Sequence, residues 1–194
     1  DRLTKHFDQI ETAVRHTIRL LNDVLLIGKA EAKRVEFDPQ PLNVKGLCQG
    51  IVEEFTFTIG SNYEILFSST GQCELIVMDE KLIRHILTNL LSNAIKYTIN
   101  GGAVRFDLSC EKESVTFRVQ DEGIGIPEED QKHLFQSFHR AKNVGTISGT
   151  GLGLAITKHS VDLHGGKIDC ESEVDVGTTF TVVIPIARTK AGSR

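Results

Sequence analysis

Three glycines at alternate positions lead into a predicted helix, and this pattern constrains the fold of the chain more than any other feature. Residues 149–156 read GTGLGLAI. Glycine lacks a Cβ atom, so Gly149, Gly151 and Gly153 allow an anion to approach the backbone N–H groups closely. The helix expected to begin near Leu152 adds a partial positive charge at its N-terminus. The segment therefore predicts a nucleotide phosphate site, and the alternative is an ordinary glycine-rich turn before an amphipathic helix.

A carboxylate at the end of a predicted strand is the second candidate site element. Residues 115–120 alternate between apolar and polar side chains, and Asp121 follows them, with glycines two and four positions later. Asp121 can therefore accept a hydrogen bond from a ligand amine such as that of adenine. The alternative is a turn carboxylate before a helix opened by Pro127, whose acidic residues 128–130 complement the helix dipole. Both interpretations can hold together.

Residues 80–97 form the third element, a predicted amphipathic helix. Its apolar stripe at helical spacing consists of Ile83, Ile86, Leu87, Leu90 and Ala94, and we expect this stripe to face a core. Asn89, Asn93 and Lys96 project from another common face, although asparagine is a poor residue for a helix interior. An amide oxygen is a suitable ligand for Mg²⁺, and a lysine can neutralise phosphates. The alternative is a solvated polar face.

Four segments together resemble, in order, the N, G1, F and G2 boxes of bacterial sensor histidine kinases. They are NLLSNAIKYT from residue 89, DEGIGIP from residue 121, LFQSFHR from residue 134 and GTGLGLAI from residue 149. These kinases share an ATPase superfamily with gyrase and the mismatch-repair clamps, and the resemblance covers nearly all of residues 3–186. It implies an α+β fold, namely a two-layer α/β sandwich with a mixed sheet (the Bergerat-type ATP-binding fold), preceded by one long dimerisation helix.

The resemblance also implies ATP and Mg²⁺ as cofactors and gives roles to individual residues. Asn93 would be the metal ligand, and Asn93, Lys96 and Arg140 would be catalytic, with Arg140 at the γ-phosphate. Asp121 would bind the adenine amine with support from Thr178. The remaining cofactor-binding residues that it implies are Asn89, Tyr97, Gly123, Gly125, Ile126, Gly149, Thr150, Gly151, Leu152, Gly153 and Leu154.

The segment between the third and fourth boxes is expected to be a lid over the nucleotide. Residues 137–148 lack a sustained helical or strand period, and loops of this kind often gate chemistry. We expect Phe135 and Phe138 to anchor the lid by packing rather than to touch the ligand. Lys142 is either a solvated lysine or a phosphate contact.

Residues 1–38 are expected to form a partial dimerisation helix and linker. An apolar seam with steps of three or four is formed by Leu3, Phe7, Ile10, Val14, Ile18, Leu21 and Leu25. Two prolines near residue 40 indicate a domain boundary near residue 38, with the catalytic domain at 39–188 and a disordered tail at 189–194. We expect the seam to form a homodimer, and the alternative is a helix that packs on its own domain.

The resemblance implies transfer of the ATP γ-phosphoryl group to a histidine on a dimerisation hairpin, for relay to an aspartate of a response regulator. None of the seven histidines is followed by the acidic residue typical of the acceptor, so we expect the acceptor to be absent. His16, and less so His6, are the weak candidates. Asn89 stands where hydrolytic relatives are expected to carry a glutamate base, which disfavours an ATPase clamp. A degenerate ATP-binding module is the other alternative.

Composition narrows the classes of partner. The net charge is −4 with both signs interspersed, which indicates no nucleic-acid or anionic membrane partner. No stretch approaches the roughly 20 apolar residues of a membrane span. The four cysteines, at 48, 73, 110 and 170, are widely spaced, so neither a zinc site nor a disulfide is predicted and a reducing cytoplasm is favoured. Because the chain opens on Asp1, we expect it to be part of a longer protein.

The patterns also predict the order of elements after residue 42. The expected helices are 43–59, 80–97, a short 127–135 and 151–164, and the expected strands are 63–68, 73–78, 102–110, 114–121, 166–173 and 177–186.

Overall fold

The computed structural model describes residues 36–59, 62–73 and 75–186. In the N-terminal segment it also describes Phe7, Val14, Thr17, Ile18, Leu21, Val24, Leu25 and Gly28. The chain divides into two compact units, Asp1–Glu36 and Phe37–Arg194. The predictions for Leu3, His6, Ile10, His16 and the tail at 189–194 lie outside the described residues.

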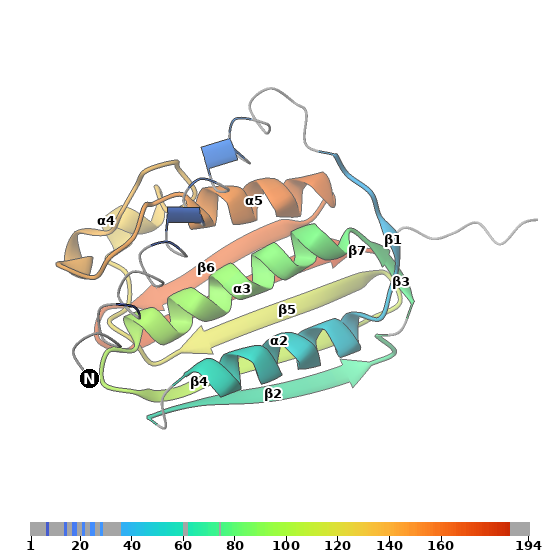
Figure 1. Cartoon of the computed structure of the whole chain (residues 1–194), viewed down its shortest axis with the longest axis horizontal. Coiled ribbons are helices and arrows are strands. Elements are labelled where there is room, and N and C mark those ends of the chain that lie inside the picture. The colour runs from blue at the N-terminus through green and yellow to red at the C-terminus, as the bar shows by residue number, and fades with distance from the viewer. Residues whose placement is uncertain are drawn as a thin grey trace, which may run out of the picture. The chain divides into compact units, whose positions relative to one another are not determined.

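Strands and helices are interspersed along the second unit (Figure 1). Its elements are β1 (Gln40–Leu42), α2 (Val44–Thr58), β2 (Tyr63–Gly71), β3 (Ile76–Met78), α3 (Glu80–Tyr97), β4 (Gly102–Cys110), β5 (Ser114–Asp121), α4 (Glu128–Gln131), the 3₁₀ helix η1 (Lys142–Val144), α5 (Gly153–Leu163), β6 (Lys167–Glu173) and β7 (Gly177–Pro185).

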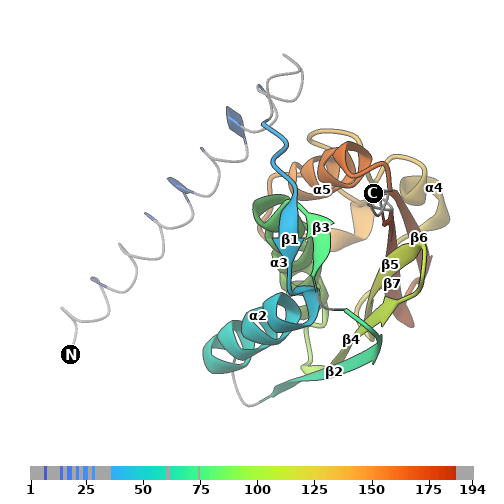
Figure 2. The ribbon, with the colours of Figure 1, turned by 90° about the vertical axis from the view of Figure 1, so that its right-hand side faces the viewer.

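Five strands form the main sheet in the order β2-β4-β5-β7-β6. The pair β2–β4 is parallel, and the other three pairs are antiparallel. Helices α2, α3 and α5 lie together on one face of this sheet, as the turned view makes clear (Figure 2). The predicted two-layer sandwich with a mixed sheet is therefore confirmed.

The core lies between the sheet and the helix layer, and alternating strand residues supply it. In β5, Val115, Phe117 and Val119 are buried, whereas Arg118 between them is exposed. The apolar stripe predicted for residues 80–97 is also confirmed, because every member of it is at most 2% exposed in α3. Burial of each isoleucine or leucine of the stripe contributes about 1.5 to 3 kcal/mol, which holds the helix face against the sheet.

Side-chain caps set the start of two helices. The Asn43 carboxamide oxygen accepts a hydrogen bond from the Gly46 N–H at 2.9 Å at the start of α2. The Asp79 carboxylate accepts one from the Leu82 N–H at 3.1 Å at the start of α3. Each cap satisfies a backbone donor that has no partner within its helix, and so fixes the position of the first turn.

Several predicted elements differ from the structure. The strand predicted at 63–68 extends to Gly71, and the strand predicted at 73–78 begins only at Ile76. Strand β1 was missed, because its pairing with β3 forms only after the chain folds back from Leu42 to Ile76. The predicted helix at 127–135 ends at Gln131, after which the chain turns toward the lid. Helix α5 begins at Gly153 rather than 151, since Gly151 has φ +72°, which is not helical.

A disulfide joins Cys73 to Cys110, with 5.4 Å between their Cα atoms, so the prediction of no disulfide was wrong. The register pairs Gly71 of β2 with Cys110 of β4, and Cys73 follows two residues later. The two cysteines are 37 residues apart in sequence, and only the parallel strand pairing brings them together. The other two cysteines, Cys48 and Cys170, are free.

The first unit carries its described seam residues on an open surface. Phe7, Val14, Ile18, Leu21 and Leu25 are helical and between 51% and 65% exposed. Among the residues that the structure describes, no helix is both long and apolar enough to cross a membrane.

Candidate functional site

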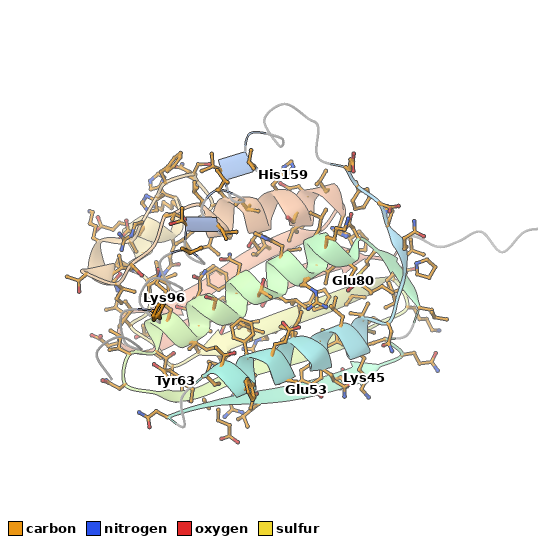
Figure 3. All side chains as sticks on the ribbon, in the orientation of Figure 1. Lys45, Glu53, Tyr63, Glu80, Lys96 and His159 are labelled. Atoms are coloured by element: carbon orange, nitrogen blue, oxygen red, sulfur yellow. A yellow bond between two sulfur atoms is a disulfide. The ribbon has the colours of Figure 1, made fainter. Side chains whose placement is uncertain are left out.

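The candidate site lies where the C-terminal half of α3 meets the start of α5 and the loop after β5. Glu80 and Lys96 mark the two ends of α3, and Lys96 lies at the end nearer α4 (Figure 3). Helix α3 packs against α5 along much of its length, which places the predicted N and G2 boxes side by side.

Asn89 reaches across to the first turns of α5. Its amide nitrogen donates a hydrogen bond to the Thr157 hydroxyl at 2.8 Å. Its amide oxygen lies so close to Gly153 that a Cβ atom there would collide with it. The polar face predicted on residues 80–97 is therefore not simply solvated, because Asn89 joins the two helices.

Lys96 and Tyr97 lie against the glycine loop. The Lys96 ammonium is 3.1 Å from the Tyr97 hydroxyl and 4.6 Å from the centre of its ring. A Cβ atom on Gly149 would come within 2.8 Å of the same ammonium. Asn93, one turn before Tyr97, is half-buried on the same helix. A lysine, a tyrosine and an open glycine loop thus meet at one place, which suits an anion.

Asp121 is a buried carboxylate at the end of β5, with 6% of its surface exposed. The Gly123 N–H donates a hydrogen bond to its Oδ1 at 2.9 Å. Burial raises the pKa of Asp121 to about 6, and hydrogen bonds from the Gly123 and Thr178 backbone oppose that shift. Such a carboxylate favours a partner that can donate a hydrogen bond to it.

Thr178 pairs with Asp121 across β5 and β7, and its hydroxyl lies 2.8 Å from the Ser172 hydroxyl. Ser172 in turn accepts a hydrogen bond from the Ile126 N–H at 2.8 Å and donates one to the Gly177 carbonyl at 2.9 Å. Ser172 was missed in the sequence, where it is only one polar residue in an alternating strand. It fastens the loop after β5 to the sheet edge.

Two glycines in the predicted boxes are required by the backbone. Gly125 has φ +63°, and a Cβ atom there would collide with the Glu173 carbonyl. Gly151 has φ +72°, and its Cβ would lie 2.6 Å from the His139 carbonyl. Both positions therefore exclude any larger residue.

The start of α5 combines buried anchors with open backbone donors. Leu152 is 2% exposed, and Leu154 packs against the core. The Thr150 hydroxyl accepts a hydrogen bond from the Leu152 N–H at 3.2 Å. Within the described residues no side chain caps the N-terminus of α5. Its first N–H groups are available to an anion, as at other helix N-termini that bind phosphate.

Comparison with known proteins agrees with this geometry. Residues 78–188 match the family of histidine kinase-, DNA gyrase B-, and HSP90-like ATPases. The chain belongs to this ATPase family. The match begins at β3 and includes α3, the loop after β5, the lid and α5, which together supply the residues described above.

Similar proteins within the family include sensor histidine kinases. The chain is 36% identical over 172 residues to sensor histidine kinase WalK of Bacillus subtilis, covering 87% of this chain and 28% of WalK. It is 36% identical over 190 residues to circadian input-output histidine kinase CikA of Synechococcus elongatus, covering 95% of this chain and 25% of CikA. The chain thus spans about a quarter of the length of these relatives.

Solved structures of the family have the same fold. Full-length ShkA in complex with AMPPNP superposes with a TM-score of 0.77 at 28% identity, over 89% of this chain and 36% of ShkA. The catalytic domain of histidine kinase ThkA superposes with a TM-score of 0.67 at 30% identity, over 78% of this chain and 99% of that domain.

The segment predicted to be the lid, residues 137–148, makes hydrogen bonds to backbone carbonyls in this ATPase-family chain. The Phe138 N–H donates a hydrogen bond to the Gly151 carbonyl at 2.9 Å, and the Arg140 guanidinium donates one to the Ile147 carbonyl. Phe135 packs against the core as predicted. Phe138 does not, because it is 71% exposed with φ +66°, so its prediction as a packing anchor was wrong.

The structure distinguishes between the two alternatives for Lys142, a solvated lysine and a phosphate contact. Its ammonium lies 3.0 Å from a Glu129 carboxylate oxygen, and both side chains are largely exposed. A hydrogen bond and opposite charge from Glu129 raise the pKa of Lys142. The side chain is therefore a solvated ion pair in this structure rather than a residue that points into the site.

Asp130 was predicted to complement the dipole of a helix, and this interpretation was incomplete. The carboxylate is buried, with 3% of its surface exposed. Its Oδ2 accepts a hydrogen bond from the Lys142 N–H at 2.9 Å, and its Oδ1 lies 3.4 Å from Nε2 of His139. Helix α4 is only four residues long, so the main partner of Asp130 is the lid.

Proposed function

We propose that this chain is the ATP-binding catalytic part of a sensor histidine kinase. It binds ATP with Mg²⁺ and transfers the γ-phosphoryl group to a histidine of a dimerisation hairpin. One arrangement carries the proposal: Lys96 lies at Gly149 and Asn89 at Gly153, while buried Asp121 ends β5 just before the loop that contacts Tyr97. That loop is joined to α3 by a hydrogen bond from the Ile124 N–H to the Tyr97 carbonyl at 3.2 Å.

The two ends of this site suit the two ends of ATP. Asp121 accepts a hydrogen bond from the adenine amine, and the Ser172–Thr178 pair keeps the neighbouring loop in place. The phosphates lie at the glycine loop, where Lys96 supplies positive charge and the uncapped N-terminus of α5 supplies N–H donors. The complex of full-length ShkA with AMPPNP supports the same class of ligand.

The residues present also fit a magnesium ion. Asn93 offers a neutral amide oxygen on α3, one turn before Tyr97 and beside the lysine. In the described part of the chain, no group of three or more His, Cys, Asp or Glu side chains could hold a metal. Magnesium in such sites takes one or two protein ligands and completes its shell with phosphate oxygens and water. When bound, it would stabilise charge on the transferring phosphoryl group.

Phosphoryl transfer fits the site better than hydrolysis. A nitrogen of the neutral acceptor imidazole attacks the γ-phosphorus, the bond to the bridging oxygen breaks, and ADP leaves. Lys96 and Arg140 hold the phosphates through charge, and the reaction needs no carboxylate to deprotonate water. Asn89 cannot serve as such a base, because an amide does not take up the proton and its nitrogen already binds Thr157.

The partners follow from the same proposal. The exposed apolar seam of the first unit suits a homodimer, since isolated helices with such a seam are marginal in water. A receiver domain of a response regulator then takes the phosphoryl group onto an aspartate. Because ATP and the receiver domain are cytoplasmic, we place this part of the protein in the cytoplasm. The cysteines no longer support this placement, since Cys73 and Cys110 form a disulfide.

Labelling with γ-³²P-ATP and Mg²⁺ tests the proposal. The chain is incubated alone and with a separately prepared dimerisation hairpin from the same parent protein, and label that is acid-labile and base-stable is counted. We expect label on the hairpin only, since no histidine of this chain has the sequence context of an acceptor. Binding of ATP without any label would instead indicate a degenerate module. Label on this chain alone would point to His6 or His16.

A further inference from the structure

We infer that Asn143 and Asp130 are positioning residues that hold the lid on the loop after β5, and so control nucleotide release and the placement of Arg140. The inference rests on the proposed function, because it deepens how the same site works. Neither residue belongs to the predicted set of nucleotide contacts, and each acts here through the backbone of another segment.

Asn143 is the point where the middle of the lid meets the nucleotide loop. Its amide nitrogen donates to the Gly125 carbonyl at 2.9 Å and lies 3.4 Å from the Ile124 carbonyl. Two carbonyl oxygens can be faced only by the donor end of an amide, which fixes the orientation of the side chain. Asn143 lies within the short helix η1, so this contact ties η1 to the loop after Asp121.

The loop that receives Asn143 is itself held by contacts with neighbouring segments. Gly125 lies against the Glu173 backbone, and the Asp175 N–H donates a hydrogen bond to the Ile124 carbonyl at 3.1 Å. The Gln131 amide donates to the Ile126 carbonyl and to the Ser172 carbonyl, both at 2.9 Å. Asn143 therefore binds a loop that other contacts already hold. Its hydrogen bond restricts the movement of the lid rather than that of the loop.

Asp130 holds the base of the lid on both sides of Arg140. One buried carboxylate contacts the His139 ring before Arg140 and the Lys142 N–H after it. Hydrogen bonds to a charged, buried acceptor are stronger than neutral ones. The residue pair that flanks Arg140 therefore lies at one carboxylate, with Lys142 held by a hydrogen bond and the His139 ring at 3.4 Å. The Arg140 guanidinium donates a hydrogen bond to the Ile147 carbonyl across the lid. That guanidinium can exchange this carbonyl for a γ-phosphate while the backbone stays in place.

The test compares Asn143→Asp with Lys142→Met. The first variant keeps the side-chain size but places a carboxylate against two carbonyl oxygens, and the second removes only the exposed ion pair with Glu129. We expect hydrogen–deuterium exchange of lid amides in the nucleotide-free protein to rise about tenfold in Asn143→Asp, the loss expected for one good hydrogen bond. It should be unchanged in Lys142→Met, and amides of α3 should be unchanged in both.

Nucleotide kinetics give the second readout. We expect an ATP carrying a fluorescent label on its ribose to dissociate about tenfold faster from Asn143→Asp, with association within about twofold of the wild type. Asn143→Gln, which keeps a donor amide, should recover part of the slow release. Asp130→Asn should lower the rate of phosphoryl transfer more than it weakens ADP binding, because Arg140 loses its placement.

The outcomes separate this inference from the proposed function. Unchanged lid exchange in Asn143→Asp overturns the inference, whatever the nucleotide does. The inference is overturned as well if Asn143→Asp matches the wild type both in lid exchange and in the rate at which fluorescent ATP is released. A wild-type protein that binds no ATP overturns the proposed function instead, and the exchange experiment still judges the contact of Asn143.

Discussion

The Asp79 N–H donates a hydrogen bond to Nε2 of His164, with 3.1 Å between the two nitrogen atoms. Nδ1 of the same ring lies 2.8 Å from the Ser160 carbonyl, so Nδ1 carries the proton and the ring is neutral. The Asp79 carboxylate accepts the Asp38 N–H at 3.0 Å, and the Phe37 ring stands edge-on to the imidazole at 5.0 Å. The start of α3, the end of α5 and the preceding segment therefore meet at one histidine.

This contact predicts a loss of stability in mild acid. Burial lowers the pKa of His164, although the Ser160 carbonyl and the charge of Asp79 oppose the shift. The unfolded chain takes up a proton near the ordinary histidine value of about 6.5, whereas the folded chain resists it until a lower pH. The stability from the neutral ring is present above about pH 6.5 and is lost as the pH falls below it. Calorimetry from pH 7.5 to 5 should show a steeper fall in Tm for the wild type than for His164→Gln, and parallel curves would contradict this.

Asp121→Asn should stabilise the fold and weaken nucleotide binding. The rise of the Asp121 pKa from 3.8 to about 6 corresponds to roughly 3 kcal/mol of cost for the ionised form at neutral pH. Asparagine keeps an oxygen for the Gly123 N–H without the charge, so we expect about 1 to 3 kcal/mol more free energy of unfolding. Because the cost appears between pH 4 and 6, the gain in urea denaturation should be near its maximum at pH 7 and absent at about pH 3.

The same variant should lose about 1.5 to 3 kcal/mol of ATP affinity, as for a hydrogen bond to a charged acceptor. Isothermal titration calorimetry at pH 7.5 measures it. Asp107→Asn is a suitable control, since its carboxylate binds the exposed Ser68 hydroxyl, away from the site. Equal ATP affinity for wild type and Asp121→Asn would refute the adenine contact.

Asn93→Ala should remove the magnesium dependence of ATP binding and slow phosphoryl transfer. Mutation of a direct ligand deprives the ion of an oxygen that the phosphates cannot replace. ATP affinity is measured with Mg²⁺ and with EDTA, and transfer is measured by γ-label. The metal assignment fails if the variant keeps the wild-type ratio of the two affinities.

Arg140→Ala should slow transfer by about 10²-fold or more while ADP affinity stays within about twofold. A positive group at the γ-phosphate stabilises charge that develops in the transition state, and ADP lacks that phosphate. Lys132→Ala, an exposed position before the lid, is the control. Equal losses for ATP, ADP and transfer would contradict the role of Arg140.

Reduction of the disulfide should lower stability without removing the nucleotide site. The bond closes a loop of 37 residues, for which the chain-entropy relation gives roughly 4 kcal/mol, and 2 to 4 kcal/mol is typical. Cys73→Ser with Cys110→Ser should unfold at lower urea concentration than the wild type in oxidised buffer. Cys170→Ser, which removes a free thiol, serves as the control. Dithiothreitol should bring the wild type to the level of the double variant, and no difference would show that the bond is dispensable.

The sequence was sufficient to predict elements whose limits are set locally. Helix α3 was predicted with its observed bounds, because Asp79 caps its start and an apolar stripe at helical spacing runs from Ile83 to Ala94. Strands β4 and β5 were also predicted with their observed bounds, since strict alternation shows which residues face the core. Several candidate site residues lie together as the box order indicated, including Lys96 at Gly149 and Asn89 at Gly153.

Features that depend on contacts between distant segments were not predictable in this way. The β1–β3 pairing and the Cys73–Cys110 bond both follow from the tertiary register, which no local pattern encodes. Asp130 resembles any acidic residue in a first helical turn, yet its carboxylate accepts a hydrogen bond from the Lys142 N–H twelve positions later and lies 3.4 Å from the His139 ring. Phe138 is a large apolar residue of the kind expected in a core, but its left-handed backbone turns the side chain to the surface.

The contacts of Phe37 and Asp38 bear on where this ATPase-family domain can be joined to another sequence. These two residues precede every strand of the domain, yet Asp38 contacts Asp79 at the start of α3 and Phe37 contacts His164 at the end of α5. A fusion point upstream of Glu36 would leave the contacts of the domain intact, whereas one placed after Asp38 would replace residues that the domain already uses. The domain therefore starts, in structural terms, inside the segment that the sequence indicated to be a linker.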